Sequence, residues 1–324
     1  MSNLRFAQRA AFAFCCSALS MAGWAQSYPS KPVRIVVPYS AGGVVDLLAR
    51  TLAPTLGETL GVPIVVEDRP GVGGTVGSEF ASRASPDGYT LLLASSSSHS
   101  IPLALGRKLP YDPVRDFTPI VHLGSVPSIM LVPAGTPAKT LREWIDYARQ
   151  KNGELNYASG GSGTIVWLVT ELLKAQTGVA MTHVAYKGTT PAVVDLMAGN
   201  VDLLFDALPT GLPHVRDGRL RALGVTSRHR SPLAPEVPPI ADTLPGFEAN
   251  AWFGLYGPRA LPADVVARVN QAANRALADP RLRDKLQHLG VDLAGGTPQQ
   301  LSRTMVDDTA KWKKIVGDRP LPHD

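Results

Sequence analysis

The chain has 324 residues, of which 44% are hydrophobic, so it is long enough to bury one large core or two smaller ones. Its net charge is +5, but the basic residues are scattered and form no stripe interleaved with aromatic residues, which argues against nucleic-acid binding. The two cysteines, Cys15 and Cys16, are adjacent, and the seven histidines show no paired ligand spacing, so a structural zinc site is not expected.

Residues 1–25 have the pattern of a secretory signal peptide. Arg5 and Arg9 form a basic start, an apolar stretch runs from residue 10 to residue 25, and Gly23-Trp24-Ala25 is a small-residue cleavage site. The apolar stretch is shorter than the ~20 residues that a membrane-spanning helix needs, and no later segment approaches that length. We therefore expect the chain to be exported and not to be embedded in a membrane.

Beyond this segment, short runs of β-branched residues alternate with helical patterns, which is typical of an α/β fold with mostly parallel, covered sheets. The runs predict strands at 33–38, 64–67, 90–94, 129–132, 156–159, 183–186, 201–206 and 222–226. The helical patterns predict helices at 44–60, 74–84, 141–151, 164–177, 192–198, 210–217, 263–278 and 298–314.

Two proline-rich segments indicate where the chain passes between lobes. Residues 127–137 carry three prolines, and residues 231–245 carry five. Chains of this size usually divide into domains, and such segments suit a crossing. We therefore expect a first lobe formed by residues 26–124 plus 250–324, and a second lobe, residues 125–249, inserted between them.

A buried strand, a glycine turn and a helix start follow one another between residues 33 and 46. Glycines allow the backbone to approach a ligand, and the free N–H groups of the next helix would point into the turn, which is the architecture of an anion site. Alternatively, the glycines only close a turn, and Asp46 favours the first helical turn electrostatically. The candidate ligand-binding residues here are Tyr39, Ala41, Gly42, Gly43 and Asp46.

A second turn of this kind spans residues 155–164 and precedes another helix. Ser159, Gly163 and Thr164 are its candidate ligand-binding residues. Their hydroxyl and N–H groups could meet a second carboxylate, or Thr164 could simply cap the helix, and one group can do both. The sequence thus offers two candidate anion sites, one before each of these two helices.

Four further candidates stand at the ends of predicted strands or in glycine loops. Gly74 belongs to a glycine-rich loop that is equally well an ordinary turn, and Ser95 begins a serine-rich loop after a strand. Lys187 follows a strand and precedes a helix, so it could add charge to the site or lie on the surface. Asp206 ends an apolar strand and could contact an amine or hydroxyl of a ligand, or be satisfied within the sheet.

Local signatures of catalysis are missing from the sequence. Residues 160–163 approach the Gly-x-Ser-x-Gly pattern of hydrolases, but Thr164 stands where the last glycine should be. Val76 interrupts the only dinucleotide-like glycine pattern, and a phosphate-binding Gly-Lys pair is absent. We therefore expect no enzyme activity, no cofactor and no metal. The alternative from another class is a secreted hydrolase with Ser159 or Ser162 as nucleophile and a histidine as base.

Nine motifs follow one another in order along the chain. They lie at residues 28–34, 38–46, 67–71, 86–91, 109–113, 157–164, 183–188, 220–225 and 252–255. In this order they resemble the periplasmic solute-binding proteins of the tripartite tricarboxylate transporters, the Bug or TctC-like family. The resemblance covers nearly all of the chain after residue 26.

The resemblance implies a two-lobed periplasmic-binding-protein (Venus flytrap) fold with a ligand cleft between the lobes. It implies a periplasmic protein that captures a small carboxylate solute (a dicarboxylate, tricarboxylate, amino acid or aromatic acid) and delivers it to membrane permease subunits. In this family the turn matching residues 38–43 typically holds one carboxylate, and the turn matching residues 159–164 serves the opposite lobe. A ligand-sensing partner of a membrane receptor is the alternative, because both roles use the same clamshell.

Three residues depart from the pattern of the family. Ala41 replaces the usual proline, Val45 replaces a frequent threonine or serine, and Trp167 stands where a histidine is common. Val45 and Trp167 bear on the polarity of the pocket, so the usual dicarboxylate assignment is less secure in this chain. Ligand binding is expected to bridge the lobes and shift an equilibrium between open and closed forms by hinge rotation in the two crossing segments.

Overall fold

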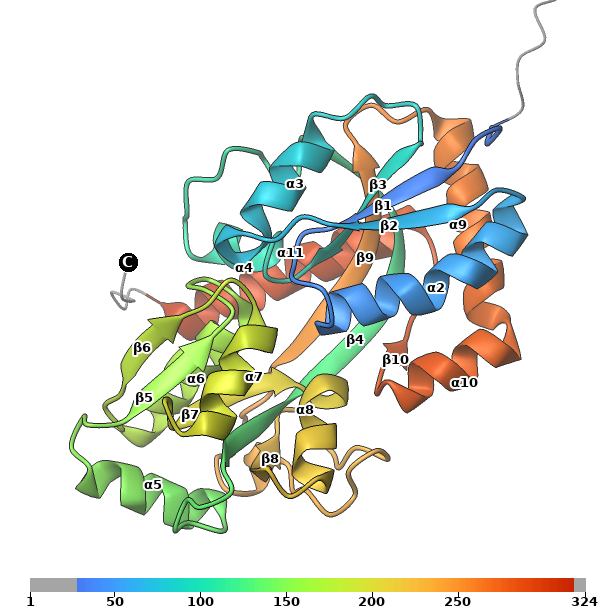
Figure 1. Cartoon of the computed structure of the whole chain (residues 1–324). Coiled ribbons are helices and arrows are strands. Elements are labelled where there is room, and N and C mark those ends of the chain that lie inside the picture. The colour runs from blue at the N-terminus through green and yellow to red at the C-terminus, as the bar shows by residue number, and fades with distance from the viewer. Residues whose placement is uncertain (1–27, 318–324) are drawn as a thin grey trace, which may run out of the picture.

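The structure is a computed structural model that describes residues 28–317 (Figure 1). The predicted signal peptide, residues 1–25, and both cysteines lie outside the described residues. Within residues 28–317, no helix combines the length and the apolar composition needed to cross a membrane.

Two α/β lobes are joined by two long neighbouring strands (Figure 1). The elements of the first lobe are β1 (Val33–Val37), α2 (Val44–Leu60), β2 (Ile64–Asp68), η1 (Val72–Gly74), α3 (Thr75–Ser82), β3 (Thr90–Ser95) and α4 (Ser100–Ala104). The second lobe contains α5 (Leu141–Gln150), β5 (Asn156–Ser159), α6 (Ile165–Thr177), β6 (Thr182–Ala185), α7 (Thr189–Ala198), β7 (Leu203–Ala207), α8 (Leu208–Arg216), β8 (Leu220–Val225) and η2 (Ile240–Asp242). The joining strands are β4 (Phe117–Pro133) and β9 (Asn250–Pro258).

The last part of the chain covers the first lobe. It forms α9 (Ala263–Ala278), α10 (Pro280–His288), β10 (Asp292–Leu293) and α11 (Pro298–Val316). Helices α9 and α10 pack on α2, and α11 packs on α4 and β4. Helix α9 buries one apolar face, and the side chains of Trp144, Trp252 and Trp312 are buried as well.

The sheet is parallel at its edges and antiparallel in its middle. The strand order is β2-β1-β3-β9-β4-β7-β5-β6. Strands β1, β2 and β3 pair in parallel, as do β5, β6 and β7, whereas β9 pairs antiparallel with β3 and β4, and β4 pairs antiparallel with β7 and β8. The expectation of mostly parallel sheets is therefore wrong for the centre, because β4 and β9 run in opposite directions and β4 continues into the second lobe, where it pairs antiparallel with β7 and β8.

The passage between the lobes differs from the one expected at residues 231–245. That proline-rich segment packs within the second lobe, where the Val225 N–H donates to the Pro238 carbonyl at 2.9 Å. The chain crosses instead within β4 and at the start of β9, where Pro127 and Asn250 are register partners. The prolines of residues 231–245 build a loop on β8, since proline cannot donate to a sheet ladder.

Candidate functional site

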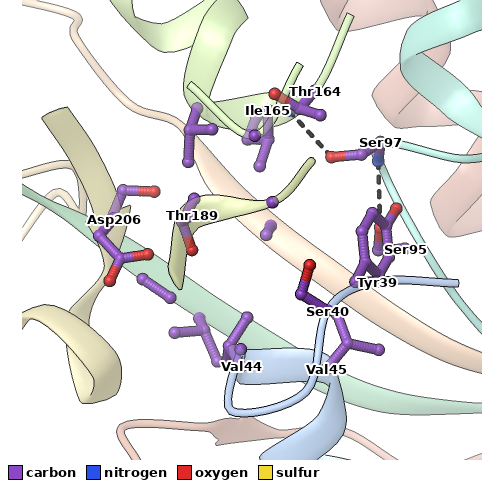
Figure 2. A pocket seen from close by; sticks show the side chains of 18 of the residues that line it. Tyr39, Ser40, Val44, Val45, Ser95, Ser97, Thr164, Ile165, Thr189 and Asp206 are labelled. Atoms are coloured by element: carbon purple, nitrogen blue, oxygen red, sulfur yellow. Dashed lines mark hydrogen bonds between the residues drawn. The ribbon is translucent and has the colours of Figure 1, made fainter. Parts of the chain in front are cut away.

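A pocket lies where the two lobes face each other, and Figure 2 shows it from close by. The empty space between its walls is about 660 Å³, which includes the solvent at its open mouth. Its walls are formed by Tyr39, Ser40, Gly43, Val44, Val45, Ser95, Ser97, Val126, Ser128, Gly160, Thr164, Ile165, Val166, Gly188, Thr189, Thr190, Asp206, Ala207, Ala251 and Phe253.

The starts of four helices open on this pocket. Gly43 precedes α2, Thr164 precedes α6, Gly188 precedes α7, and Ala207 precedes α8, and all four residues line the walls or the mouth. The first N–H groups of a helix have no partner within the helix, and the helix dipole places partial positive charge there. The arrangement is therefore suited to binding anionic groups without a cationic side chain.

The buried carboxylate of Asp46 holds the turn before α2 in its conformation. Asp46 Oδ2 accepts the Gly42 N–H at 2.8 Å, and Asp46 Oδ1 lies 2.5 Å from Arg50 Nε. Gly42 adopts a φ of +77°, which favours glycine. In the described chain, the pocket wall does not include Asp46, Gly42 or Ala41. These three residues shape the turn that places Gly43 at the wall.

Tyr39 and Ser95 form a polar corner of the pocket. Tyr39 Oη and Ser95 Oγ are 2.7 Å apart, and the Ser97 N–H donates to Ser95 Oγ at 3.3 Å. Burial raises the pKa of the Tyr39 phenol, so the side chain stays neutral and can donate or accept. Gly74 stands behind the ring, and a Cβ there would lie 2.8 Å from Tyr39 Oη. Gly74 thus supports Tyr39 by close approach rather than by lining the pocket.

The start of α6 is capped from both lobes. Thr164 Oγ1 accepts the Trp167 N–H at 3.4 Å and donates to the Gly161 carbonyl at 2.7 Å. The Ile165 N–H donates across the cleft to Ser97 Oγ at 2.9 Å (Figure 2). Thr164 therefore caps its helix and lines the pocket at once, as the sequence left open.

Ser159 and Gly163 support this turn from behind. Ser159 Oγ lies 2.7 Å from His183 Nε2 and accepts the Gly161 N–H at 3.0 Å. A Cβ on Gly163 would lie 2.7 Å from Arg107 Nη1. Neither residue is part of the pocket wall in the described chain. The Ser159 and His183 pair has the contact that a hydrolase would need, but its serine is fully buried behind the pocket.

The start of α7 closes the mouth against the first lobe. Ser40 Oγ donates to the Lys187 carbonyl at 2.5 Å, and Thr190 Oγ1 donates to the Ala41 carbonyl at 3.4 Å. The structure therefore brings the backbone of Lys187 to the cleft, whereas its side chain is not part of the pocket wall that the described residues form.

Asp206 is an acidic residue on the wall, at the end of β7. Its side chain is 2% exposed, and Thr210 Oγ1 donates to Asp206 Oδ2 at 2.7 Å. Burial raises the pKa of the Asp206 carboxyl, because the charged form is poorly solvated there. Figure 2 shows Asp206 and Thr189 on the opposite side of the pocket from Tyr39 and Ser95.

Apolar side chains separate these two polar regions. Val44 and Val45 form one wall, and Ile165 faces them from the second lobe (Figure 2). Among residues 28–317, no Lys, Arg or His side chain lines the pocket. The same range holds no cluster of His, Cys, Asp or Glu able to bind a metal ion. The pocket therefore suits a small molecule with an anionic group and an apolar body.

Sequence reasoning placed the candidates in the right turns but not always on the wall. Five of them line the pocket: Tyr39, Gly43, Ser95, Thr164 and Asp206. The wall also includes residues that sequence reasoning missed, namely Ser40, Ser97, Ser128, Thr189, Thr190 and several apolar side chains. A signal for Thr189 and Thr190 exists, because they follow Gly188 at the start of a helix, as Thr164 follows Gly163. Ser128 and Phe253 come from the joining strands and carry no local signal.

Comparison with known proteins gives a consistent result. The sequence model of a family described as the tripartite tricarboxylate transporter family receptor matches residues 48–321. A relative from Pseudomonas sp., described as a UPF0065 protein in the tcbD-tcbE intergenic region, is 38% identical over 301 residues, covering 91% of this chain and 88% of the relative. Protein BugT of Bordetella pertussis is 35% identical over 299 residues, covering 91% of each chain.

Solved structures show the same architecture. MatC from Rhodopseudomonas palustris, with bound malate, has a TM-score of 0.84 at 34% identity and covers 89% of this chain and 100% of its own. A second Rhodopseudomonas palustris protein, with adipate, has a TM-score of 0.86 at 34% identity and covers 89% and 97%. The periplasmic binding protein BugD has a TM-score of 0.83 at 31% identity and covers 89% and 97%.

Proposed function

Since the chain belongs to the tripartite tricarboxylate transporter receptor family, we propose that it captures a small carboxylate solute between its lobes and delivers it to a membrane permease. Proteins of this family and of similar structure are periplasmic solute-binding proteins with a two-lobed fold, and not enzymes. This corrects the alternative of a secreted hydrolase built on Ser159 or Ser162.

One observation carries the proposed ligand class: four helix starts converge on one pocket, and in the described chain those of α2 and α7 have neither a side-chain cap nor a carboxylate directly before them. Uncapped N–H groups and helix dipoles bind carboxylates without a cationic partner. The start of α2 is the clearest example in the described chain, because no side chain caps its N-terminus and its cap residue is Gly43. Related structures with malate and with adipate support a carboxylate as the ligand here.

We further propose the lobe boundaries and the location. Lobe 1 comprises residues 26–124 and 250–324, and lobe 2 comprises residues 125–249. Strand β4 pairs with β9 up to Pro127 and with β7 and β8 from Ser128 onward, which supports a division inside β4. Residues 1–25 act as a cleaved signal peptide, which directs the chain to the periplasm.

A thermal-shift screen with malate and adipate tests the proposal. Ligand at about 100 times its dissociation constant should stabilise the native state by about 2.7 kcal/mol. For chains slightly smaller than this one, each kcal/mol raises the melting temperature by roughly 2–4 °C, so this stabilisation gives a measurable shift. The diamides of the same compounds keep the size but lack the negative charges, so they serve as matched controls and should give no shift.

Analysis of the acid after incubation with the protein completes the test. A binding protein returns the acid chemically unchanged, and mass spectrometry of the incubated ligand measures this. If the diamides stabilise the chain as much as the acids, carboxylate recognition by the helix starts is wrong.

A further inference from the structure

Asp206 gives the pocket a chemically distinct end. It is the ionisable carboxyl on a wall that, over residues 28–317, contains no Lys, Arg or His. Its side chain is buried, and it accepts a hydrogen bond from Thr210 Oγ1 at 2.7 Å. A buried carboxylate without a cationic partner is costly, so its position on a pocket wall calls for a reason.

Burial on balance raises the pKa of the Asp206 carboxyl, and the groups around it offset part of this effect. Helix α8 begins directly after it, with Ala207 as the cap residue, so the partial positive charge of this helix start lies beside the carboxylate. Thr210 on the first turn of α8 supplies the hydrogen bond. Asp206 thus neutralises the helix start nearest to it, and that start is no longer available to an anion from outside.

The opposite end of the pocket has no such carboxylate. The start of α2, with Gly43 as its cap residue, carries no side-chain cap in the described chain, and Tyr39 and Ser95 provide neutral polar groups beside it. Figure 2 shows Tyr39 and Ser95 across the pocket from Asp206. A ligand carboxylate is therefore best accommodated at the α2 end, which places the remote end of the ligand at Asp206.

From this asymmetry we propose that the pocket selects acids whose remote end donates a hydrogen bond, such as a hydroxyl or amino group, over diacids of the same length. The inference rests on the proposed function, since it requires that one carboxylate binds at the α2 end. A hydroxyl at the remote end donates to Asp206 and gives the buried carboxylate a further partner. A second ionised carboxylate meets Asp206 as a like charge, and two such groups in contact cannot both stay ionised.

Three six-carbon acids that differ only at one end test this proposal: hexanoate, its ω-hydroxy derivative, and adipate. Their affinities for the wild-type chain are measured by titration calorimetry at about pH 8, where both carboxylates of adipate are ionised. We expect the ω-hydroxy acid to bind at least about tenfold more tightly than adipate, because the site rejects the group that leaves Asp206 facing a like charge. Adipate binding as tightly as the ω-hydroxy acid would overturn the proposal.

The variant Asp206→Asn assigns the effect to this residue. The carboxamide is uncharged and can donate to a carboxylate, so the tenfold preference should fall to about threefold or less. Asp217→Asn is the matched control, because Asp217 carries the same charge at the far end of α8 and its salt bridge to Arg219 at 3.0 Å lies outside the pocket. A preference that persists in Asp206→Asn shows that another group causes it and overturns the assignment.

Hexanoate separates the two proposals. It has the carboxylate for the α2 end and nothing at the remote end, so its binding reports the proposed function alone. If the three acids bind but the preference is absent, the inference about Asp206 is wrong and carboxylate binding stands. If none of the three binds, both are wrong. Should Asp206→Asn fail to fold, the wild-type ratio still decides the preference.

Discussion

At the residue scale, His99 shows how completely burial controls a titratable group in this protein. Its ring is fully buried in the first lobe, with the rings of Phe117 and Tyr256 centred 4.9 Å and 4.6 Å away. Nδ1 lies 3.1 Å from Ser98 Oγ, and Nε2 has no hydrogen-bond partner in the part of the chain that the structure describes. Burial lowers the pKa of His99 to about 3, so the imidazole is neutral in the folded chain.

The titration of His99 predicts acid sensitivity. Its pKa is 6.5 in the unfolded chain and about 3 in the folded one, so between these values the unfolded state binds more protons. The contribution of the neutral imidazole to stability is complete above the higher value and is lost as the pH falls toward the lower one. The slope reaches about 1.4 kcal/mol per pH unit.

The variant His99→Gln tests this contribution. It keeps a polar side chain but removes the titration, so the free energy of unfolding should depend less on pH. Urea denaturation at about pH 7 and about pH 5 measures the difference for both chains. An equal loss of stability in wild type and variant would show that other groups cause the acid sensitivity.

At the element scale, helix starts serve two different purposes in this chain. Thr140 caps α5, where its side chain accepts the Glu143 N–H at 3.2 Å on the surface of the second lobe. Thr164 caps α6 in the same way but also lines the pocket. Each cap therefore contributes to stability in the same way, but only Thr164 faces the proposed ligand.

A pair of threonine variants separates capping from binding. Thr140→Val and Thr164→Val keep the side-chain shape and remove the capping oxygen, so each should lower the free energy of unfolding by about 1 kcal/mol. Only Thr164→Val should also weaken the binding of malate or adipate, as measured by titration calorimetry. If both variants bind these acids as the wild type does, Thr164 has no role in the site beyond capping.

At the scale of the whole molecule, the lobes are in contact across the cleft. Ser40 reaches the Lys187 carbonyl, Arg107 Nη1 donates to the Ser162 carbonyl at 2.8 Å, and Ser97 accepts the Ile165 N–H. Each of the three contacts joins a segment of the first lobe to a segment of the second. Because β4 and β9 are the joining strands, small rotations in them can open all three contacts together.

Two glycines test the importance of this closure. Gly188 adopts a φ of +129°, and a Cβ there would lie 2.6 Å from Ser40 Oγ of the opposite lobe. Gly178 adopts a φ of +72° at the end of α6, and nothing lies within 4 Å of its added Cβ. Gly178→Ala should lower the free energy of unfolding by about 1–2 kcal/mol, because alanine disfavours the left-handed backbone conformation, but it creates no clash. It is therefore the matched control for Gly188→Ala.

Gly188→Ala should weaken carboxylate binding at least about tenfold, because the added methyl group would collide with Ser40 across the cleft and we expect ligand binding to favour the closed form. Gly178→Ala should lower the melting temperature but leave the affinity unchanged. Small-angle scattering with saturating adipate measures the closure directly: the variant Gly188→Ala should stay more extended than the wild type. Superimposable scattering of the two chains would contradict a closure that depends on this approach.

Local patterns in the sequence were sufficient for most of the elements. The bounds of α2 were predicted to the residue, because Gly43 and Gly61 flank an amphipathic run. Two of the elements that were missed have weak local signals: α4 has five residues and contains Pro102, and β9 mixes aromatic residues with glycines in a run without a clear period. Helix α10 was missed as well, although Asp279 caps its start and Pro280 follows. Only the apolar end of β4 was predicted, since Pro119 and Pro127 interrupt the pattern that its neighbours β9 and β7 support by pairing.

The sequence by itself determined the family, the α/β class and the turns that carry the pocket, because these depend on residues that are close along the chain. Tertiary structure alone decided which side chains of those turns face the pocket. It turned Asp46 toward Gly42 and Arg50, placed Ser159 against His183, and brought Ser97 and Asp206 to the wall from the turn after β3 and from β7, which lie far apart in the sequence. The physical reason is that packing between elements sets the direction of a side chain, and the spacing of residues along the sequence does not determine which elements pack together.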